Sequence, residues 1–478
     1  MVFTSLNFFI FFPAVIIIYF LLPQKFRWIF LLIASYYFYI NIKPVYALLL
    51  AGVTLTTWFF TILIEKAKSE KRKRLLLIAD IVITLLPLFF FKYFNFVNEG
   101  IFTLLDFAGL RWPLPNISLL LPVGISFYTF MALGYAIDVY NDDIKAEKNF
   151  GIVALFLSFF PVVMSGPIER ATNMFHQFSG KLKFNADMFV KGSQLILWGY
   201  FMKLVVADRL GIYIDAVFNN AEQHVGSSLL LATFMQPIRV YGDLGGYSLI
   251  AIGCAKVMGI NVIPNFNRPF FATTMSEFWR RWHMSFIKWL TDYIYTPLSF
   301  SFRKYRIWGI VTALMLTFII SGIWHGAALG FIIWGAMQGM ILSIETLTKK
   351  RKDFFEKKYL LNSKWWYIMW GCMLTYSLYA FSLIFGTADS VAGSLSIIKK
   401  IFTDSFQFPY KDGDTMLYGF IGFSILFIKD FMDEYYPGRI LLFDNKHTMV
   451  RWFSYYFLIF IIFYFGVFSG EQFVYFQF

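Results

Sequence analysis

Long apolar stretches, separated by short polar loops, dominate this sequence. They fall at about residues 8–22, 28–42, 45–64, 75–94, 119–137, 150–164, 188–207, 228–260, 307–344, 365–386, 415–429 and 452–469. A helix that crosses the hydrocarbon core needs about 20 largely apolar residues, so several stretches are long enough for one crossing and 307–344 is long enough for two. We therefore predict an all-α polytopic membrane protein with about 11 transmembrane helices. Two or three further helices would enter the membrane without crossing it.

Composition supports this class. The chain is 58% hydrophobic and 15% charged, which leaves too little polar surface for a soluble protein of this length. Aromatic residues make up 22% of the chain, as suits lipid-facing surfaces and interfacial belts. No hydrophilic stretch is long enough for a separate soluble domain. We expect one integral membrane domain over residues 1–478, with its core motifs in 121–347.

The net charge of +13 is concentrated in loops between apolar stretches. The densest basic clusters, 65–74 and 349–358, are typical of loops held on the cytoplasmic side of a cell membrane. This placement predicts an outside N-terminus and leaves the side of the C-terminus open. It also argues against a nucleic-acid partner, because no domain is left to bind one. No Lys or Arg precedes Lys25, so we interpret residues 8–22 as a retained membrane segment and not a signal peptide.

The sequence shows none of the common metal or nucleotide motifs. Cys254 and Cys372 lie in apolar surroundings, form no CxxC or Cys/His spacing, and are interpreted as packing residues. There is no P-loop, GxSxG elbow or HExxH. We expect no metal and no tightly bound cofactor.

Residues 261–306 are more polar than their neighbours. On a helix, Phe278, Trp282, Phe286 and Trp289 would form one aromatic stripe, with Arg280, Arg281, His283 and Lys288 mostly elsewhere. This pattern predicts an amphipathic helix that lies at the interface or dips into the protein.

His325 is the first candidate for chemistry. No charged residue occurs from 307 to 344, so an ionisable group there is costly and is expected to face a cavity or a partner. Gly322 and Gly326 flank it and allow another backbone or a substrate to approach closely. A neutral imidazole could take a proton from a hydroxyl nucleophile as a general base. A structural histidine, hydrogen-bonded between helices or placed at an interfacial turn, is the alternative.

Other polar residues have two interpretations each. His283 is either functional or an amphipathic surface residue, and the two neighbouring arginines would disfavour its protonated form. Asp243 lies four residues after Arg239, which allows a local ion pair on a helix, although the surrounding glycines and Pro237 favour a broken helix that lines a cavity. Asp138 and the segment 167–170, with Glu169, are similarly open. We assign no role to His176, His224 and His447, which lie in more polar loops.

Four segments resemble the membrane-bound O-acyltransferase family, and within it the branch of the alginate O-acetyltransferase membrane subunit. They are LPVGISFYTFMALGYAIDVY (121–140), FFPVVMSGPIER (159–170), NFNRPFFATTMSEFWRRWHMSFIKWLTDYIYTP (265–297) and SGIWHGA (321–327). The ending FVYFQF (473–478) also looks like this branch. The resemblance covers nearly the whole chain, and FWRRWH followed by WHG at this separation is highly specific.

The resemblance implies a helical ring with a central funnel and an acyl transfer reaction. His325 would be the catalytic histidine and His283 the second essential position. Further funnel-lining candidates are Asp243, Arg239, Arg280, Arg281, Trp282, Trp324, Asn267 and Glu169. The acyl group, most simply acetyl, would come from a cytoplasmic thioester, either acetyl-CoA or an acyl carrier protein. A thioester is an activated donor, so the protein need supply mainly positioning and a base.

Two departures affect the acceptor. The stretch GDLGGYSL (242–249) stands where this branch has DFSGYSD, and LSFSFRKYR (298–306) replaces LGGNR. We therefore expect a cell-envelope or exported polysaccharide without naming alginate. D-alanyl transfer from a carrier protein towards teichoic acid is the alternative within the family. A polysaccharide or lipid-carrier transporter is the alternative from another class, but it predicts internal repeats that we do not see. We also expect a separate periplasmic or extracellular acyltransferase partner, because no extramembrane domain is present.

Overall fold

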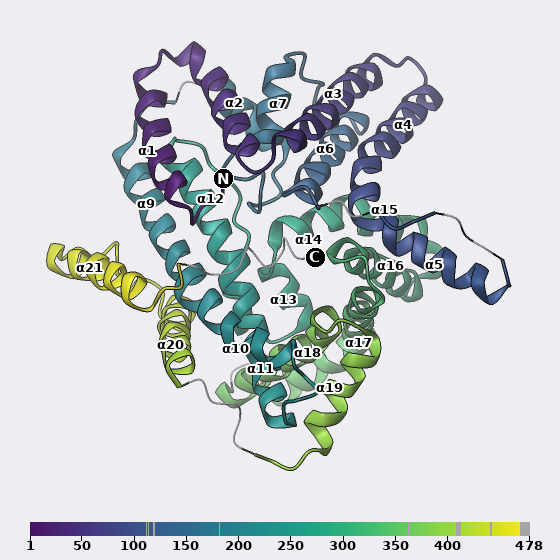
Figure 1. The fold of residues 1–478 in the computed structure, drawn as a ribbon, viewed down its shortest axis with the longest axis vertical. Coiled ribbons are helices and arrows are strands. Elements are labelled where there is room, and N and C mark those ends of the chain that lie inside the picture. The colour runs from purple at the N-terminus through teal and green to yellow at the C-terminus, as the bar shows by residue number, and fades with distance from the viewer. Residues whose placement is uncertain are drawn as a thin grey trace. The chain divides into compact units, whose positions relative to one another are not determined.

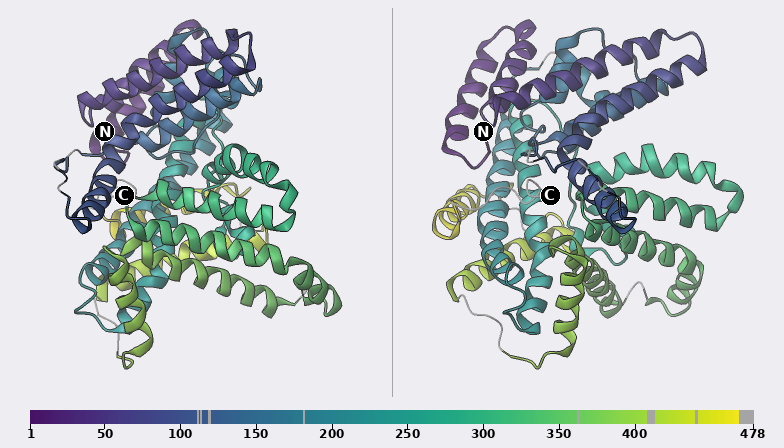
Figure 2. Two further views of the ribbon diagram at one scale, coloured as in Figure 1. Left: turned by 90° about the vertical axis from the view of Figure 1, so that its right-hand side faces the viewer. Right: turned by 45° about the vertical axis from the view of Figure 1, so that its right-hand side comes forward.

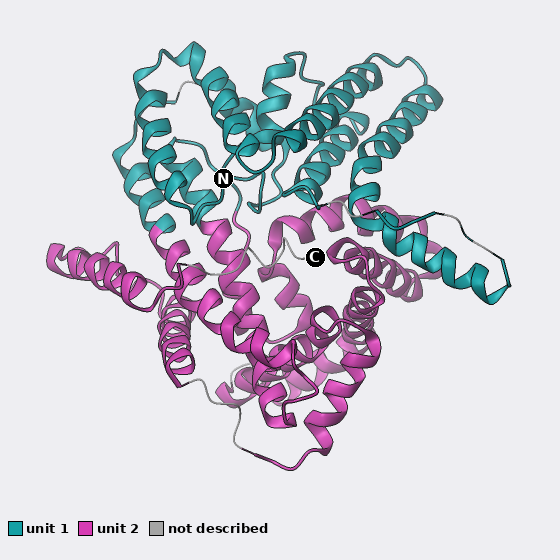
Figure 3. Ribbon diagram, viewed as in Figure 1, with its two compact units in different colours: residues 1–196, 250–263 teal, residues 197–249, 264–478 magenta. Residues whose placement is uncertain are grey.

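The computed structural model describes residues 1–110, 112, 114–117, 120–180, 182–361, 364–407, 413–439 and 442–468. Within these ranges all regular secondary structure is helical, as Figure 1 shows, which confirms the predicted all-α class. The ending 473–478, one of the segments that carried the family resemblance, lies outside them. The chain divides into two compact units, residues 1–196 with 250–263 and residues 197–249 with 264–478, coloured separately in Figure 3. Whether these form one domain, as the sequence led us to expect, remains a prediction.

Unit 1 contains the N-terminal helices. They are α1 (Leu6–Leu21), α2 (Gln24–Ile40), α3 (Pro44–Lys66), α4 (Glu70–Leu88), η1 (Phe89–Tyr93), α5 (Phe94–Phe107), α6 (Ile125–Tyr140), α7 (Phe150–Ser158) and α8 (Ala171–Ser179). Helix α6 is buried along nearly its whole length and packs against α3, α4 and α7. The segment after α7 is buried although it is not helical, and Gly124 with φ +77° packs directly on its backbone. Unit 1 is therefore organised around α6.

Two helices cross between the units in sequence, α9 (Ala186–Tyr200) and α12 (Gly246–Val257). The other elements of unit 2 are η2 (Phe201–Ala207), α10 (Asp208–Phe218), α11 (Gly226–Val240), η3 (Tyr241–Gly245), η4 (Pro269–Phe271), α13 (Met275–Arg281), α14 (Met284–Leu290), η5 (Thr291–Tyr295), α15 (Thr296–Ser301), η6 (Arg303–Tyr305), α16 (Ile307–His325), α17 (Leu329–Lys358), α18 (Trp365–Thr387), α19 (Val391–Thr403), α20 (Gly413–Tyr435) and α21 (Thr448–Phe465).

Helices α16 and α17 form an antiparallel hairpin, and this is the most extensive helix contact in the described part of the chain. They lie side by side in both views of Figure 2. Gly322 of α16 faces Gly335 of α17, where an added Cβ would lie 3.1 Å or less from the partner backbone. Small residues at such a crossing let two backbones approach closely in a membrane. The prediction that 307–344 holds two helices is confirmed.

Seven helices of the described residues are long and apolar enough to span a membrane. They are α3, α4 continued through η1 and α5, α16, α17, α18, α20 and α21. Helix α1 is apolar but has 16 residues. The estimate of about 11 crossings thus remains a prediction. The apolar stretch 150–164 is not one long helix: α7 ends at Ser158, and a buried non-helical segment follows.

Two π-helical segments, η2 and η3, pack against each other in unit 2. A glycine permits the contact, because a Cβ on Gly242 of η3 would lie 3.0 Å from the carbonyl oxygen of Met202 of η2. Single π turns inside helices rearrange the local hydrogen bonding and are frequent at functional sites. The helix break predicted near Pro237 and the glycines after it does not occur, because α11, η3 and α12 follow one another without a gap and the helix is disturbed there by a π-helical turn.

Candidate active site

A cavity of about 40 Å³ within unit 2 has both candidate histidines, His283 and His325, in its wall. The other lining residues come from α11, α13, the α13–α14 junction, α17 and α18: Gln236, Val240, Trp279, Trp282, Phe331, Trp334, Tyr379, Leu383, Gly386 and Thr387. By volume, the cavity holds about three water-sized groups. Two histidines separated by 42 positions thus meet at one small chamber.

His325 is the last residue of α16, at the turn of the α16–α17 hairpin. The turn begins with Gly326, where a Cβ would lie 2.1 Å from the ring of Phe331. Only a residue without a side chain allows this ring to close over the turn. The two glycines around His325 thus permit close approach by the backbone of α17 and by Phe331. His325 is half-buried beside the cavity.

His283 lies between α13 and α14 in a left-handed conformation, with φ 46° and ψ 48°. The prediction of one amphipathic helix over this segment is wrong, because the chain breaks here into two helices of seven residues each. All four aromatic residues of the expected stripe are buried in unit 2, and so do not lie on an exposed interfacial face. A non-glycine residue in this conformation is uncommon and needs support from its surroundings.

Asn265 provides that support. Its Oδ1 lies 2.9 Å from Ser285 Oγ, 3.3 Å from the Ser285 backbone N and 3.1 Å from Nδ1 of His283. Its Nδ2 donates to Ser248 Oγ at 2.9 Å, and its carbonyl oxygen accepts from the Met284 N–H at 2.8 Å. A backbone N–H only donates, which identifies the shared atom as the amide oxygen. Nδ1 of His283 therefore carries the proton, and Nε2 presents a lone pair.

The charge of His283 follows from its burial. The side chain is 1% exposed, and desolvation lowers its pKa from 6.5 to about 3. We expected the neighbouring arginines to disfavour the protonated form, but burial is the cause, and Arg280 is exposed. His283 is consequently neutral throughout the physiological pH range. It can accept a hydrogen bond through Nε2 but does not carry a positive charge.

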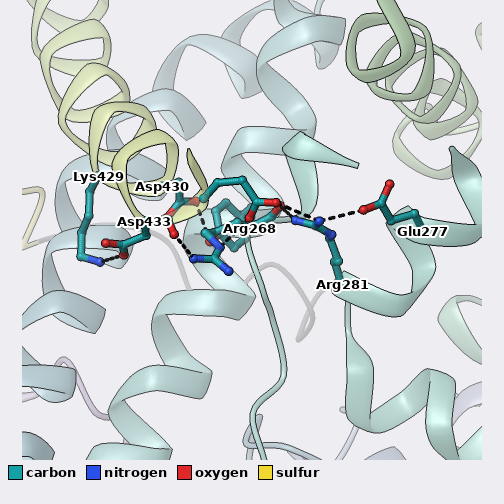
Figure 4. A network of polar contacts seen from close by, with 8 residues as sticks. Arg268, Glu277, Arg281, Lys429, Asp430 and Asp433 are labelled. Carbon is teal, nitrogen blue, oxygen red and sulfur yellow. Dashed lines mark hydrogen bonds and ion pairs between the residues drawn. The ribbon is translucent and has the colours of Figure 1, made fainter. Parts of the chain in front are cut away.

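Charged residues anchor α13, which precedes His283, at both ends. At its start, the Glu345 carboxylate of α17 accepts from the backbone N–H groups of Met275 and Ser276 at 2.6 and 2.9 Å. Negative charge at a helix N-terminus is favourable. At its end, Arg281 bonds to Glu277 at 2.7 Å and to Glu434 at 2.9 Å, part of the network in Figure 4. Arg281 therefore positions the segment and lies outside the cavity wall.

Aromatic rings connect the two histidines. The His325 ring lies 4.7 Å from Trp324 and 4.9 Å from Trp334, and Trp324 lies 6.0 Å from His283. Phe286 stacks on Trp324 at 4.1 Å. Trp282 and Trp324 are buried, but of the two only Trp282 lines the cavity. These ring contacts restrict the orientation of both imidazoles.

Asp243 and Arg239 form longer-range ion pairs than the local one their spacing allows. Lys203 of η2 lies 2.7 Å from Asp243 of η3 and 2.6 Å from Asp208. Arg239 makes a two-pronged contact with Asp215, at 2.5 and 2.7 Å. None of these residues lines the cavity. Both contacts join elements of unit 2, which favours the structural interpretation.

The remaining candidates do not line the cavity either. Asn267 is exposed, and its backbone N–H bonds to the carbonyl of Arg281. Glu169 is buried in unit 1, where it accepts from the Ile263 backbone N–H at 2.6 Å and from Asn173 at 2.9 Å. Asp138 lies 3.6 Å from Arg170 in the same unit. These contacts hold loops in place.

Sequence reasoning missed four residues: Gln236, Asn265, Trp279 and Trp334. Gln236, Trp279 and Trp334 line the cavity, and Asn265 orients His283. The wall can therefore supply a proton acceptor, hydrogen-bond donors and a water-poor setting, the requirements of acyl transfer to a hydroxyl. No group of three or more His, Cys, Asp or Glu able to hold a metal occurs among the residues that the structure describes.

A second, larger cavity of about 860 Å³ lies between α18 and α20. Its wall is almost wholly apolar and aromatic, including Trp365, Tyr376, Phe427 and Phe431. Neither histidine lines it. Cys372 does, while Cys254 is buried, and both thiols are free, as expected of packing residues.

Replacing Asn265 with alanine should lower catalytic turnover more than it lowers substrate binding. The change removes the acceptor for the His283 and Ser285 donors, and a lost buried hydrogen bond to each costs about 1–3 kcal/mol. His283 would then lose its tautomer and its left-handed conformation. Steady-state kinetics of acyl transfer in membranes would measure the effect.

Asn267→Ala, at the exposed position two residues later, is the matched control and should behave as wild type. Equal rates for both variants would show that Asn265 does not orient His283.

Comparison with known proteins identifies the same family as the sequence resemblance. The family model described as MBOAT, membrane-bound O-acyltransferase family, matches residues 148–385. A protein of Pseudomonas aeruginosa named probable alginate O-acetylase AlgI is 37% identical over 351 residues, which cover 72% of this chain and 66% of that protein. The chain thus spans about two thirds of the length of this relative.

Two further relatives differ in the polymer that their names give. A peptidoglycan O-acetyltransferase of Helicobacter pylori is 29% identical over 431 residues, covering 83% of this chain and 78% of the relative. A teichoic acid D-alanyltransferase of Bacillus subtilis is 26% identical over 301 residues, covering 60% and 71%. The matched region of the family model includes both histidines of the cavity.

Proposed function

Because the chain belongs to the membrane-bound O-acyltransferase family, we propose that it transfers an acyl group from a cytoplasmic thioester to a hydroxyl of a cell-envelope or exported polysaccharide. The observation that carries this proposal is the cavity whose wall contains both His283 and His325. The chain is a multi-pass membrane protein and an enzyme of this family. The donor, the roles of the histidines and the direction of transfer are proposals.

His325 acts as the general base. Its imidazole takes the proton of the attacking hydroxyl, and the same proton then reaches the departing thiolate. His283 is unsuited to this role, since its burial keeps its pKa near 3 and makes it a weak base. Its Nε2 instead accepts a hydrogen bond that orients a reactant. The two histidines therefore have different roles. His325 transfers the proton, and His283 positions a reactant.

The acyl group is short. A cavity of about 40 Å³ accommodates about three water-sized groups, which matches the three heavy atoms of an acetyl group. A longer acyl chain would require the Trp, Tyr and Phe rings of the wall to move apart. Acetyl is thus the proposed group, in keeping with the names of two of the relatives.

The hairpin suggests from which side the acceptor comes. From Leu329 to Thr348 the helix α17 has 20 residues before the basic cluster 349–358, a length of about 30 Å and close to the hydrocarbon thickness. If that cluster is cytoplasmic, as the positive-inside rule predicts, His325 lies near the opposite face. An acceptor outside the cell would then reach the cavity by a short path. The same rule places the N-terminus outside.

D-alanyl transfer towards teichoic acid remains a second candidate, supported by the relative with that name. A D-alanyl group carries an ammonium, which would need a carboxylate or a similar acceptor nearby. No Asp or Glu lines the described cavity. The wall therefore favours acetyl over D-alanyl.

The proposal predicts a chemical change in a polymer. In a strain that lacks this chain, a cell-envelope or exported polysaccharide should lose its O-acetyl groups while its export continues, as measured by mass spectrometry and NMR. Loss of D-alanyl groups would support the second candidate, and loss of export with normal acylation would indicate a transporter.

We also propose a separate extracellular acyltransferase partner. Full acetylation of polymer by the purified chain alone would contradict that partner.

A further inference from the structure

Three buried polar atoms in the cavity wall have no hydrogen-bond partner within the described part of the chain. They are Nε1 of Trp279, Nε1 of Trp334 and Oε1 of Gln236. The three side chains are each 4% exposed. Buried polar atoms are nearly always paired. A phenylalanine or leucine would fill these positions without the free-energy cost of burying an unpaired donor or acceptor. Two donors and one acceptor at one small cavity indicate a ligand that supplies their partners.

The arrangement of the two indoles fits one role. The Trp334 ring stands at 82° to the His325 ring with centroids 4.9 Å apart, and the Trp279 ring lies 6.0 Å from Trp334. The two N–H donors thus come from adjacent side chains beside the proposed base. Attack on a thioester places negative charge on the carbonyl oxygen, next to the carbon that the base-activated hydroxyl attacks. A pair of fixed donors at that point stabilises the charge.

Gln236 complements them. Its Nε2 donates to Thr387 Oγ1 at 3.4 Å, which holds the amide and leaves Oε1 as an acceptor. The thioester has no proton to donate, whereas the acceptor hydroxyl has one. The three unpartnered atoms therefore match the two reactants: two donors for the carbonyl oxygen, and one acceptor for the hydroxyl.

We propose that the indole N–H groups of Trp334 and Trp279 form the oxyanion site of this enzyme, and that Gln236 Oε1 positions the acceptor hydroxyl. The inference rests on the proposed function and assigns residues to its central step. The hydroxyl oxygen attacks the carbonyl carbon while His325 takes its proton, and the carbonyl π electrons move onto oxygen. The oxyanion, bound by both indoles, collapses as the C–S bond breaks. The thiolate takes the proton from the imidazolium, which leaves an ester and a thiol.

Trp334→Phe and Trp279→Phe test the donors, because phenylalanine keeps most of the ring and removes the N–H. The assay follows release of free thiol from acetyl-CoA and from acetylated acyl carrier protein, in membrane vesicles from cells that make the polysaccharide. Each variant should lower kcat about 100-fold with KM for the donor nearly unchanged. The melting temperature should stay the same or rise, since an unpaired donor is removed. Trp289→Phe, a buried indole of α14 outside the cavity wall, should keep the wild-type kcat.

Gln236→Leu tests the acceptor. It should raise KM for the polysaccharide about 2- to 10-fold, with KM for the thioester unchanged. Wild-type kcat in both tryptophan variants, or a loss that follows a fall in melting temperature, would overturn the oxyanion site. Failure of the wild type to release thiol from either donor would instead contradict the proposed function. The two failures are therefore distinguishable in one set of measurements.

Discussion

Replacing His325 with alanine should lower the rate of acyl transfer by about 100- to 10,000-fold, the range that a general base contributes. The imidazole lies in the cavity wall with the Trp334 ring 4.9 Å away, and within that wall His283 has a pKa too low to replace it. Without the base, a neutral hydroxyl must attack the thioester unaided. Thiol release in membranes, at matched protein level, would measure the loss.

The fold should survive this change. His325 ends α16, and the α16–α17 hairpin is held by the Gly322–Gly335 crossing. The Gln338–Ser382 hydrogen bond of 2.7 Å ties α17 to α18, and neither contact needs the imidazole. His325→Gln, which keeps a polar side chain but removes the base, should be as inactive as the alanine variant. His447→Ala removes an exposed histidine and should be fully active. Transfer at the wild-type rate by His325→Ala would contradict the base role.

The sequence was sufficient to predict the helical hairpin that carries His325. The run 307–344 has no charge, so hydrophobic length alone predicts two helices, and Gly326 marks the turn. The same reasoning leaves 150–164 open, because this apolar stretch is short for a crossing. The structure has a short helix there, followed by a buried non-helical segment. Apolar length does not distinguish a lipid-exposed helix from a segment buried inside a protein. Tertiary packing decides that, here against α2, α3 and α8.

The break at His283 could not be predicted from periodicity. The aromatic spacing from Phe278 to Trp289 fits one helix, and the residues between are not helix breakers. The left-handed conformation of His283 depends on Asn265, 18 positions away, which bonds to the backbone N–H of Ser285. Such a contact exists only after folding. The pattern left open whether these aromatic residues lie at an interface or inside the protein, and the structure buries all four.

The candidate site was partly predictable for a chemical reason. A histidine in an uncharged run is conspicuous, so His325 was found from the residues. The residues left His283 open between a functional and a surface role, and the family resemblance made it the second essential position. Gln236, Trp279 and Trp334 are uncharged and suit buried helices. What marks them as site residues is that each has a buried polar atom without a hydrogen-bond partner among the described residues, and the sequence does not show this. The charged candidates Asp243 and Arg239 were conspicuous for another reason. Each belongs to an ion pair that joins elements of unit 2.

Replacing Lys203 with methionine should lower the free energy of unfolding by about 3–5 kcal/mol, the cost of leaving buried charges without their partner. Lys203 is 2% exposed and lies 2.6 Å from Asp208 and 2.7 Å from Asp243. It joins the π-helical segments η2 and η3, whose contact the glycines make close. Denaturant titration in detergent micelles would measure the loss.

Lys429→Met is the matched control, because Lys429 and Asp433 form a partly exposed pair, visible in Figure 4, that should contribute no more than about 1 kcal/mol. Adding Asp208→Asn and Asp243→Asn to Lys203→Met should recover part of the stability, since the uncompensated carboxylates are then removed. Recovery would show that the cost comes from charge and not from lost packing of the lysine stem. Wild-type stability in Lys203→Met would mean that water reaches the carboxylates. The two π turns would then be held together by backbone packing alone.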